Sequence, residues 1–132
     1  METQQNYYMT DEDFGKFLQD IGGLENGYYS DRPRIVEPGF FAIKNGWYRI
    51  VKELIEDAIE LGWDRQVCQV KEKFGGLRFY INSAPEKVYD LISKAEKKSY
   101  EICEVCGEPG EMRSGGWILT LCDKHNLERK NR

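Results

Sequence analysis

The hydrophobic pattern of the chain changes period several times, and three of its segments repeat at the spacing of an α-helix. The first segment follows Thr10, a residue type that often caps helices, and three acids that suit the positive end of a helix. It ends at Gly22-Gly23, a typical helix stop. Further apolar stripes cover residues 47–61 and 85–102. The sequence therefore predicts three helices.

Residues 67–82 alternate instead between apolar and polar side chains, which is the period of a β-strand. The stretch QVKEKFGGLRFYIN contains Gly75-Gly76, and a two-residue turn there predicts a β-hairpin that pairs Lys73 with Arg78. The predicted apolar face holds Cys68, Val70, Phe74, Leu77, Phe79 and Ile81, and the predicted polar face holds Gln69, Lys71, Lys73, Arg78, Tyr80 and Asn82.

The strongest chemical signal is a group of cysteines near the C-terminus, together with the one histidine of the chain. Two residues separate Cys103 from Cys106 and Cys122 from His125, and fifteen residues lie between the pairs. Two intervening residues let both side chains point at one ion, and Gly107 suits the positive φ of such a knuckle. Three sulfurs and one nitrogen favour zinc over magnesium or calcium. The sequence therefore predicts a zinc site.

The predicted zinc is structural, because four protein ligands close the coordination sphere and leave no position for a catalytic water. A second hairpin turn at Gly115-Gly116 would bring the second knuckle back beside the first. Cys68 lies outside the cluster and alternates with Val70 on the predicted strand, so we expect a packed thiol rather than a nucleophile.

Three further side chains each have a structural and a functional interpretation. Glu72 would lie opposite Phe79 on the apolar face, where a raised pKa would suit an acid catalyst. We favour an edge position in which its carboxylate reaches water or pairs with a lysine. Trp47 and Trp117 head apolar segments, and we favour core positions for both over ligand platforms.

Composition limits the classes of partner. The chain has 132 residues, enough for one domain, and a formal net charge of −4, so no global field attracts nucleic acid or anionic lipid. No stretch resembles a signal peptide or a membrane span. We expect a soluble, cytoplasmic protein that has no membrane partner.

The polar face of the hairpin is basic in an otherwise acidic chain, and two interpretations stay open. Its charges could form a solvated outer face with acids nearby. Alternatively, Lys71, Lys73, Arg78 and Tyr80 could bind an anion such as a phosphate or a carboxylate. The long loop before residue 42 could add side chains to such a site, and its candidates are Tyr28, Tyr29, Arg32 and Arg34.

The sequence lacks the common signatures of catalysis. It contains no phosphate-binding loop, no serine elbow and no H-E-x-x-H motif. Assignment of the one histidine to the metal excludes nucleophile activation by histidine. Chemistry based on two carboxylates stays open, so enzyme activity is uncertain and we favour its absence.

These motifs resemble those of an uncharacterised family of small bacterial and bacteriophage proteins. The resemblance covers roughly residues 43–125, through NGWYRIVKELI, the KEKFGGLRFY hairpin, AEKKS and the C-x2-C and C-x2-H pairs of a zinc ribbon. Relatives often show a Cys-Gly-Asp-Gly-Trp type of sequence where this chain has IKNGW, so a cysteine role there is lost. The resemblance implies a prokaryotic or phage setting and no particular activity.

The predicted fold is α+β, with three helices, a small antiparallel β-hairpin or sheet and a C-terminal zinc ribbon. Residues 1–102 would form the core, residues 103–125 the ribbon packed on it, and residues 126–132 a polar tail. The favoured function is a non-catalytic, zinc-stabilised module that binds, and could inhibit, a protein partner. The alternatives are sequestration of an anionic small molecule or signalling nucleotide by the basic hairpin, and nucleic-acid binding, which the acidic balance disfavours.

Overall fold

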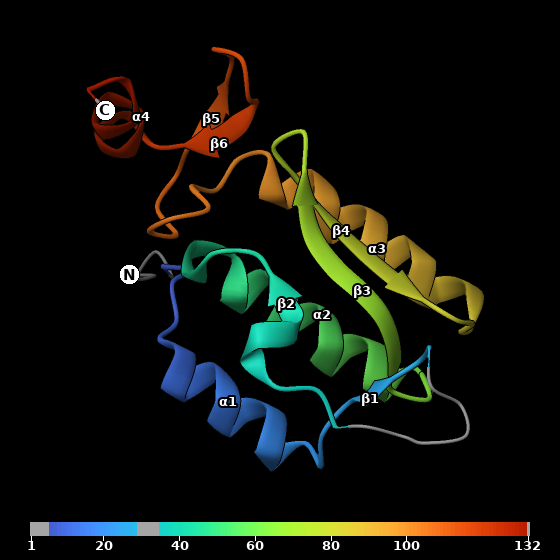
Figure 1. Cartoon of the computed structure of the whole chain (residues 1–132). Helices are drawn as coiled ribbons and strands as arrows, with labels where there is room; N and C mark the ends of the chain where they lie inside the picture. Colours follow the sequence, from blue (N-terminus) through green and yellow to red (C-terminus); the bar gives the residue numbers. More distant parts are fainter. Residues whose placement is uncertain (1–5, 29–34, 132) are drawn as a thin grey trace, which may run out of the picture.

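Four α-helices and two small sheets make up the residues that the computed structural model describes, 6–28 and 35–131 (Figure 1). The helices are α1 (Asp11–Asp20), α2 (Tyr48–Glu60), α3 (Glu86–Ser99) and α4 (Asp123–Lys130), with 3-10 turns η1 (Pro38–Phe40) and η2 (Asn45–Trp47). The strands are β1 (Glu25–Asn26), β2 (Phe41–Ala42), β3 (Gln66–Lys73), β4 (Gly76–Ile81), β5 (Glu111–Arg113) and β6 (Leu119–Leu121). The predicted α+β class is confirmed.

The three predicted helices are present as α1, α2 and α3. Helix α1 begins where the sequence pattern places it, because the Thr10 hydroxyl accepts a hydrogen bond from the backbone N–H of Asp13 at 3.0 Å. Helix α3 ends at Ser99 rather than continuing to residue 102, so an irregular segment leads to the first cysteine. None of the helices in residues 6–28 and 35–131 is long and apolar enough to cross a membrane.

Strand β3 is the central strand of the larger sheet. Strand β4 pairs with one edge of β3 in antiparallel orientation, and the short strands β1 and β2 pair with its other edge in parallel orientation. Helix α3 packs against β4 and α2, while α1 packs against α2. The smaller sheet, β5 with β6, lies beside the tip of the β3–β4 hairpin, with α4 on its far side (Figure 1).

The core is centred on aromatic side chains of the first half of the chain. Trp47 is completely buried, as predicted, and its indole Nε1–H donates to the backbone carbonyl of Ile102 at 2.8 Å. Phe14 of α1 stacks on Tyr48 of α2, with 4.3 Å between the ring centroids. The hydrogen bond from Trp47 therefore ties this core to the segment that precedes the cysteine cluster.

The β3–β4 hairpin is present, but its register differs from the predicted one by two residues. Lys73 lies opposite Gly76, not Arg78, so the two turn residues are Phe74 and Gly75. Both have positive φ, 54° and 82°, as a type I′ turn requires. A shift of two residues keeps the side chains that are still paired on their predicted faces, because successive side chains of a strand alternate between the faces. The prediction that Phe74 lies on the apolar face opposite Leu77 is wrong, because Phe74 lies in the turn and is exposed.

Close packing explains why the turn excludes Gly76. A Cβ atom at Gly76 would lie 2.5 Å from ring atoms of Tyr100, so a glycine is needed in the strand itself. The new register places Glu72 opposite Leu77. The Glu72 carboxylate accepts a hydrogen bond from the backbone N–H of Gly75 at 2.8 Å, a role in the turn that differs from both interpretations of its sequence position.

The predicted number of three helices is wrong, because α4 occupies most of the stretch expected to be a polar tail. This helix has no buried residues, so it lacks the apolar stripe by which the other helices were predicted. Contacts at its two ends hold it instead. The Cys122 sulfur caps its first turn, and the Arg129 guanidinium donates to the backbone carbonyls of Gly115 and Trp117.

Candidate metal centre and the adjoining groove

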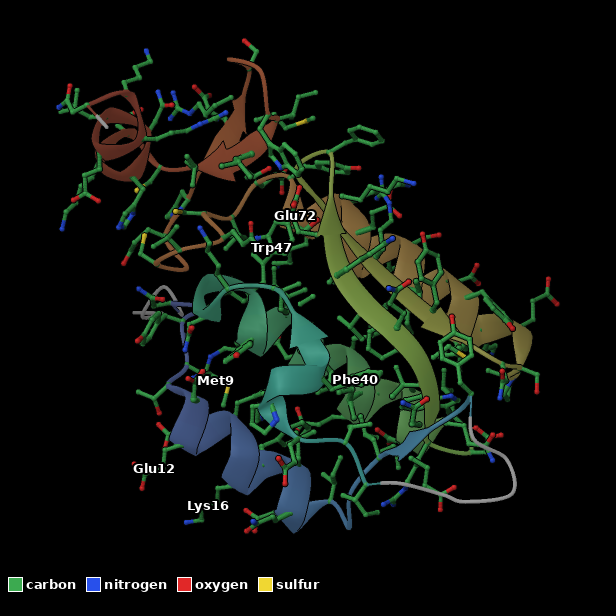
Figure 2. The ribbon with its side chains drawn as sticks, in the orientation of Figure 1. Met9, Glu12, Lys16, Phe40, Trp47 and Glu72 are labelled. Atoms are coloured by element: carbon green, nitrogen blue, oxygen red, sulfur yellow. The ribbon has the colours of Figure 1, made fainter. Side chains whose placement is uncertain are left out.

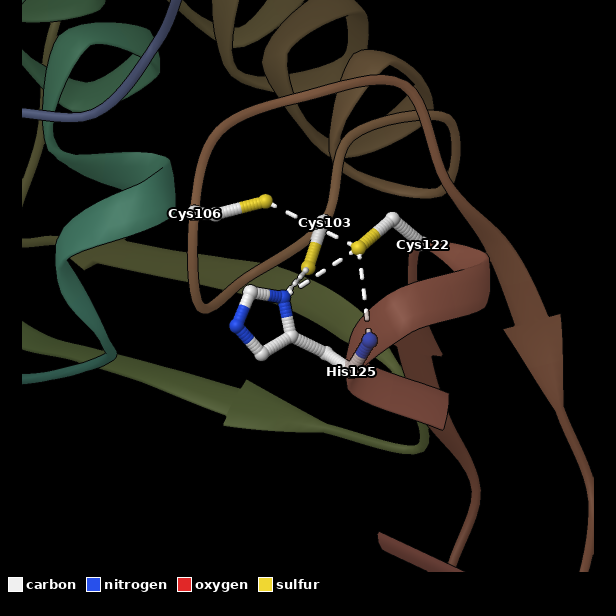
Figure 3. Close-up of side chains that lie close together, drawn as sticks. All are labelled: Cys103, Cys106, Cys122 and His125. Atoms are coloured by element: carbon white, nitrogen blue, oxygen red, sulfur yellow. Dashed lines mark hydrogen bonds between the residues drawn. The ribbon is translucent and has the colours of Figure 1, made fainter. Parts of the chain in front are cut away.

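The side chains of Cys103, Cys106, Cys122 and His125 come together at the junction of α3, β6 and α4 (Figure 3). Their ligand atoms all lie within 4.8 Å of one another. The Cys106 and Cys122 sulfurs are 3.8 Å apart, and the Cys103 sulfur is 3.6 Å from Nδ1 of His125. All four cysteines of the chain are free thiols. The group can therefore hold a metal ion, as the predicted ligand set requires.

Local backbone structure positions each pair of ligands. Cys103 and Cys106 lie in a tight turn, closed by a hydrogen bond of 2.9 Å from the Gly107 N–H to the Cys103 carbonyl. Gly107 has the predicted positive φ, at 78°. Cys122 is the N-cap of α4 and His125 lies in its first turn. The β5–β6 hairpin returns the chain so that the second pair meets the first.

The surroundings shift the pKa values of two of the thiols in opposite directions. Burial raises the pKa of Cys106 to about 12, so a metal ion would have to displace its proton. Burial alone would also raise the pKa of Cys122. Hydrogen bonds from the backbone N–H and the ring of His125 stabilise the Cys122 thiolate more strongly, so the pKa of Cys122 is lowered to about 7. The second ring nitrogen of His125, Nε2, lies 3.8 Å from the Glu128 carboxylate, the kind of partner that orients metal-bound histidines.

The first cysteine turn is held against the helical core. The Gly46 N–H donates to the Glu104 carbonyl at 2.7 Å. A Cβ atom at Gly46 would overlap the carbonyl oxygens of Cys103 and Glu104, so the two backbones touch directly. Together with the hydrogen bond from Trp47 to Ile102, this contact fixes the candidate metal centre relative to α2.

A second link joins the two hairpins. The Thr120 hydroxyl on β6 donates to the carbonyl of Gly75, in the turn of the β3–β4 hairpin, at 2.6 Å, and Thr120 is completely buried. Two large aromatic side chains remain exposed beside this link. Phe74 is 63% exposed and Trp117 is 70% exposed.

The prediction of a core position for Trp117 is wrong. Strands β5 and β6 are only three residues long, and a five-residue loop, 114–118, connects them in place of the predicted two-glycine turn. Trp117 lies in that loop and its side chain points away from the core. The pattern WILTL indicates an apolar segment, but it does not predict which of these side chains the rest of the chain buries.

Two hollows adjoin at the exposed aromatic residues and share Glu72 and Trp117 in their walls. One has a volume of about 420 Å³ and the other about 350 Å³. We refer to the two together as the hairpin groove. Figure 2 shows Glu72 near the tip of the β3–β4 hairpin, beside the C-terminal strands. The lining residues are Ala42, Ile43, Lys44, Glu72, Lys73, Phe74, Glu104, Gly116, Trp117, Ile118 and Leu119.

Glu104 is the buried acid of this groove, with only 4% of its surface exposed. Burial, together with the neighbouring charge of Glu72, raises the pKa of its carboxyl to about 7. The backbone N–H of Lys44, which donates to Glu104 Oε2 at 3.1 Å, and the charge of the Lys44 side chain oppose the shift. Sequence reasoning missed Glu104, because its position between two metal ligands gave no sign of a second role.

The four candidate residues of the basic hairpin lie on one face of the ribbon, but one of them is already paired. Arg78 lies opposite Lys71, donates to the Tyr100 hydroxyl at 3.2 Å, and forms an ion pair of 3.0 Å with Glu96. That hydrogen bond and the charge of Glu96 raise the pKa of Arg78. Lys73 is exposed, with its ammonium 5.6 Å from the Phe74 ring centroid.

Tyr80 is half exposed and lies opposite Gln69, so it does not face Lys71 as predicted. An anion site at this face stays a prediction, and one of its proposed cations, Arg78, already pairs with the Glu96 carboxylate. Tyr28 is exposed, and the loop candidates Tyr29, Arg32 and Arg34 lie outside the described residues. Cys68 is buried as predicted, and its thiol lies 3.1 Å from the Asn82 side-chain oxygen.

Comparison of the chain with protein-family models, with curated proteins and with solved structures gives no match.

Proposed function

We propose that this protein is a non-catalytic binding module that is stabilised by one structural zinc ion and acts by contacting a protein partner through its two hairpin tips. The observation that carries the proposal is the exposure of Phe74 and Trp117 at 63% and 70% on adjoining hairpins. In the prokaryotic or phage setting that the family resemblance implies, the partner would be a host or defence protein that the bound module inhibits.

The geometry of the ligand group supports zinc. Zn–S bonds of about 2.3 Å and Zn–N bonds of about 2.0–2.1 Å in a tetrahedron separate two sulfurs by about 3.8 Å, and a sulfur from a nitrogen by about 3.6 Å. Two separations in the protein match these values, 3.8 Å between the Cys106 and Cys122 sulfurs and 3.6 Å between the Cys103 sulfur and His125 Nδ1, while the Cys122 sulfur lies closer to His125 Nδ1, at 3.2 Å, and all ligand atoms lie within 4.8 Å of one another. Four ligands from the protein fit a structural ion.

Exposed aromatic side chains on a rigid support are typical of protein interfaces. Aromatic residues supply a large share of binding energy when a partner covers them, and they are enriched in the centres of interfaces. A partner loses less free energy to ordering when the contact residues are already held in place. The zinc site and the hydrogen bond from Thr120 to Gly75 would hold Phe74 and Trp117 in this way.

The zinc part of the proposal is tested by metal analysis and thiol accessibility. We expect one zinc ion per chain, and three thiols that react with a thiol reagent only after chelation: those of Cys103, Cys106 and Cys122. Cys68 is the internal control, because it is buried away from the ligand group and should react slowly in both states. Absence of stoichiometric zinc, or three thiols that react without chelation, would contradict the assignment.

The binding part is tested by capture of a partner from the natural source with the tagged, zinc-loaded protein. We expect a stoichiometric companion for the wild type and its loss for Phe74→Ser combined with Trp117→Ser. Tyr89→Ser is the matched control, because Tyr89 is a 44% exposed aromatic residue on α3, outside the groove. Equal capture by all three proteins, or no companion for the wild type, would refute the proposed contact surface.

A further inference from the structure

The hairpin groove combines features that specify more than a general apolar contact. The two hollows share Glu72 and Trp117, so a carboxylate and an indole lie at their junction. Glu104 lines the first hollow with its side chain almost fully buried, and Phe74 lines the second with its ring exposed. Negative charge therefore lies at the middle of a groove that has aromatic walls.

Neither carboxyl group has a cation within ion-pair distance among the described residues, although the charge of Lys44 acts on Glu104 from further away. Glu72 accepts the backbone N–H of Gly75 and Glu104 accepts that of Lys44, but neither forms an ion pair with a lysine or arginine. Glu72 places a carboxylate at the junction of the two hollows, and Glu104 offers a second side-chain oxygen acceptor in the first hollow, so both can accept hydrogen bonds from a cationic donor. The groove is therefore electrostatically complementary to a positive group.

The walls favour a planar cation that has apolar neighbours. Trp117 offers an indole face, the aromatic surface that attracts cations most strongly, and a guanidinium can stack on it while it donates to carboxylates. Phe74 and Ile118 extend the apolar surface on one side. Lys44 lines the first hollow together with Glu104, and Lys73 lines the second, so neither lysine lines both hollows as Glu72 and Trp117 do.

From these contacts we infer that the hairpin groove binds an arginine side chain of a protein partner, inserted between Glu72 and Glu104 against Trp117, with an apolar residue of the same segment on Phe74. The inference rests on the proposed function, for which it names the chemistry of the partner. It predicts recognition of a short segment in which arginine is flanked by apolar residues.

The test uses two synthetic peptides and the zinc-loaded, full-length protein labelled with nitrogen-15. One peptide is acetyl-Gly-Leu-Arg-Leu-Gly-amide, and in the other citrulline, an uncharged isostere, replaces arginine. The signal is the indole N–H resonance of Trp117, and the buried indoles of Trp47 and Trp63 serve as internal controls. We expect a saturable shift of the Trp117 resonance with the arginine peptide and binding of the citrulline peptide weaker by about tenfold or more, equivalent to about 1.4 kcal/mol.

The double variant Glu72→Gln/Glu104→Gln should abolish the preference for arginine. Glutamine retains the oxygen that accepts each backbone N–H, so the groove should keep its shape while it loses its charge. Lys71→Gln is the control for nonspecific charge effects, because Lys71 lies on β3 outside the groove and should leave the preference unchanged. A Trp117 resonance that does not shift, or that responds equally to both peptides, overturns the inference.

The two proposals fail separately. If capture of the partner depends on Phe74 and Trp117 but survives in Glu72→Gln/Glu104→Gln without loss, the contact surface stands and the arginine site is wrong. If capture is independent of both aromatic residues, the proposed function is wrong, whatever the peptides show. A self-associating protein, visible as a concentration-dependent mass in light scattering, would identify a second copy as the occupant and would also overturn the inference.

Discussion

The hydrogen bond between the two hairpins allows a quantitative test of the architecture. Thr120→Val replaces the hydroxyl with a methyl group of similar size and leaves the buried carbonyl of Gly75 without its donor. A buried polar group that loses its partner costs about 1–3 kcal/mol of stability. Because both ends of this 2.6 Å bond are buried, we expect a loss of about 2 kcal/mol in the free energy of unfolding.

Thr120→Ser is the matched control, because it keeps the hydroxyl and removes only a methyl group, at a cost of about 0.8 kcal/mol. Urea unfolding of the zinc-loaded proteins gives the free energies, and hydrogen exchange gives their location. In Thr120→Val, the amides of Gly75 and Gly76 should exchange faster than in the serine variant, since the hairpin tip loses its link to β6.

Two results would refute this reasoning. The first is a valine variant at least as stable as the serine variant, because the hydroxyl would then contribute nothing. The second is unchanged exchange at Gly75 and Gly76 in Thr120→Val, because the two hairpins would then not be coupled through Thr120. Either result would also remove the rigid support on which the proposed contact surface depends.

Two further predictions concern the core. Gly46→Ala should lower the free energy of unfolding by about 1–3 kcal/mol, because the added Cβ overlaps the backbone of the first cysteine turn. The control is Gly39→Ala, whose added Cβ meets nothing within 4 Å and which should leave the melting temperature nearly unchanged. Equal melting temperatures for the two variants would contradict the contact at Gly46. Burial and a hydrogen bond to Asp11 raise the pKa of Tyr48 from 10.0 to about 12, so above pH 10 the unfolded state binds fewer protons and stability should fall by about 1.4 kcal/mol per pH unit towards pH 12. Urea unfolding across this range should show a shallower decline for Tyr48→Phe, and an equal slope in both proteins would disprove the assignment.

The features predicted correctly from the sequence are those that short-range chemistry determines. The spacing within each ligand pair was enough to identify Cys103, Cys106, Cys122 and His125 as one group. The Thr10 cap was equally readable, because its hydrogen bond spans only three residues. The cap and each ligand pair involve residues only three positions apart, and the β5–β6 hairpin between the two ligand pairs brings them together.

The features that were missed depend on contacts between distant segments. Gly76 belongs to a strand because Tyr100 packs on it, and nothing near residue 76 in the sequence indicates that contact. Trp117 is exposed because its loop projects beyond β5 and β6, although it heads an apolar run. Hydrophobic pattern reports what a side chain prefers, but burial is decided by which surfaces the folded chain brings together.

At the turn of the β3–β4 hairpin, the residue that would best stabilise the turn differs from the residue that lines the groove. Phe74 adopts a φ of 54°, a conformation that costs side chains other than glycine and asparagine about 1 kcal/mol or more. Phe74→Asn would create the Asn-Gly pair that type I′ turns prefer and should strengthen the hairpin. The same substitution would remove the aromatic side chain of Phe74 from the wall of the hairpin groove. Selection for thermal stability alone should therefore favour replacement of this phenylalanine and weaken recognition of the partner.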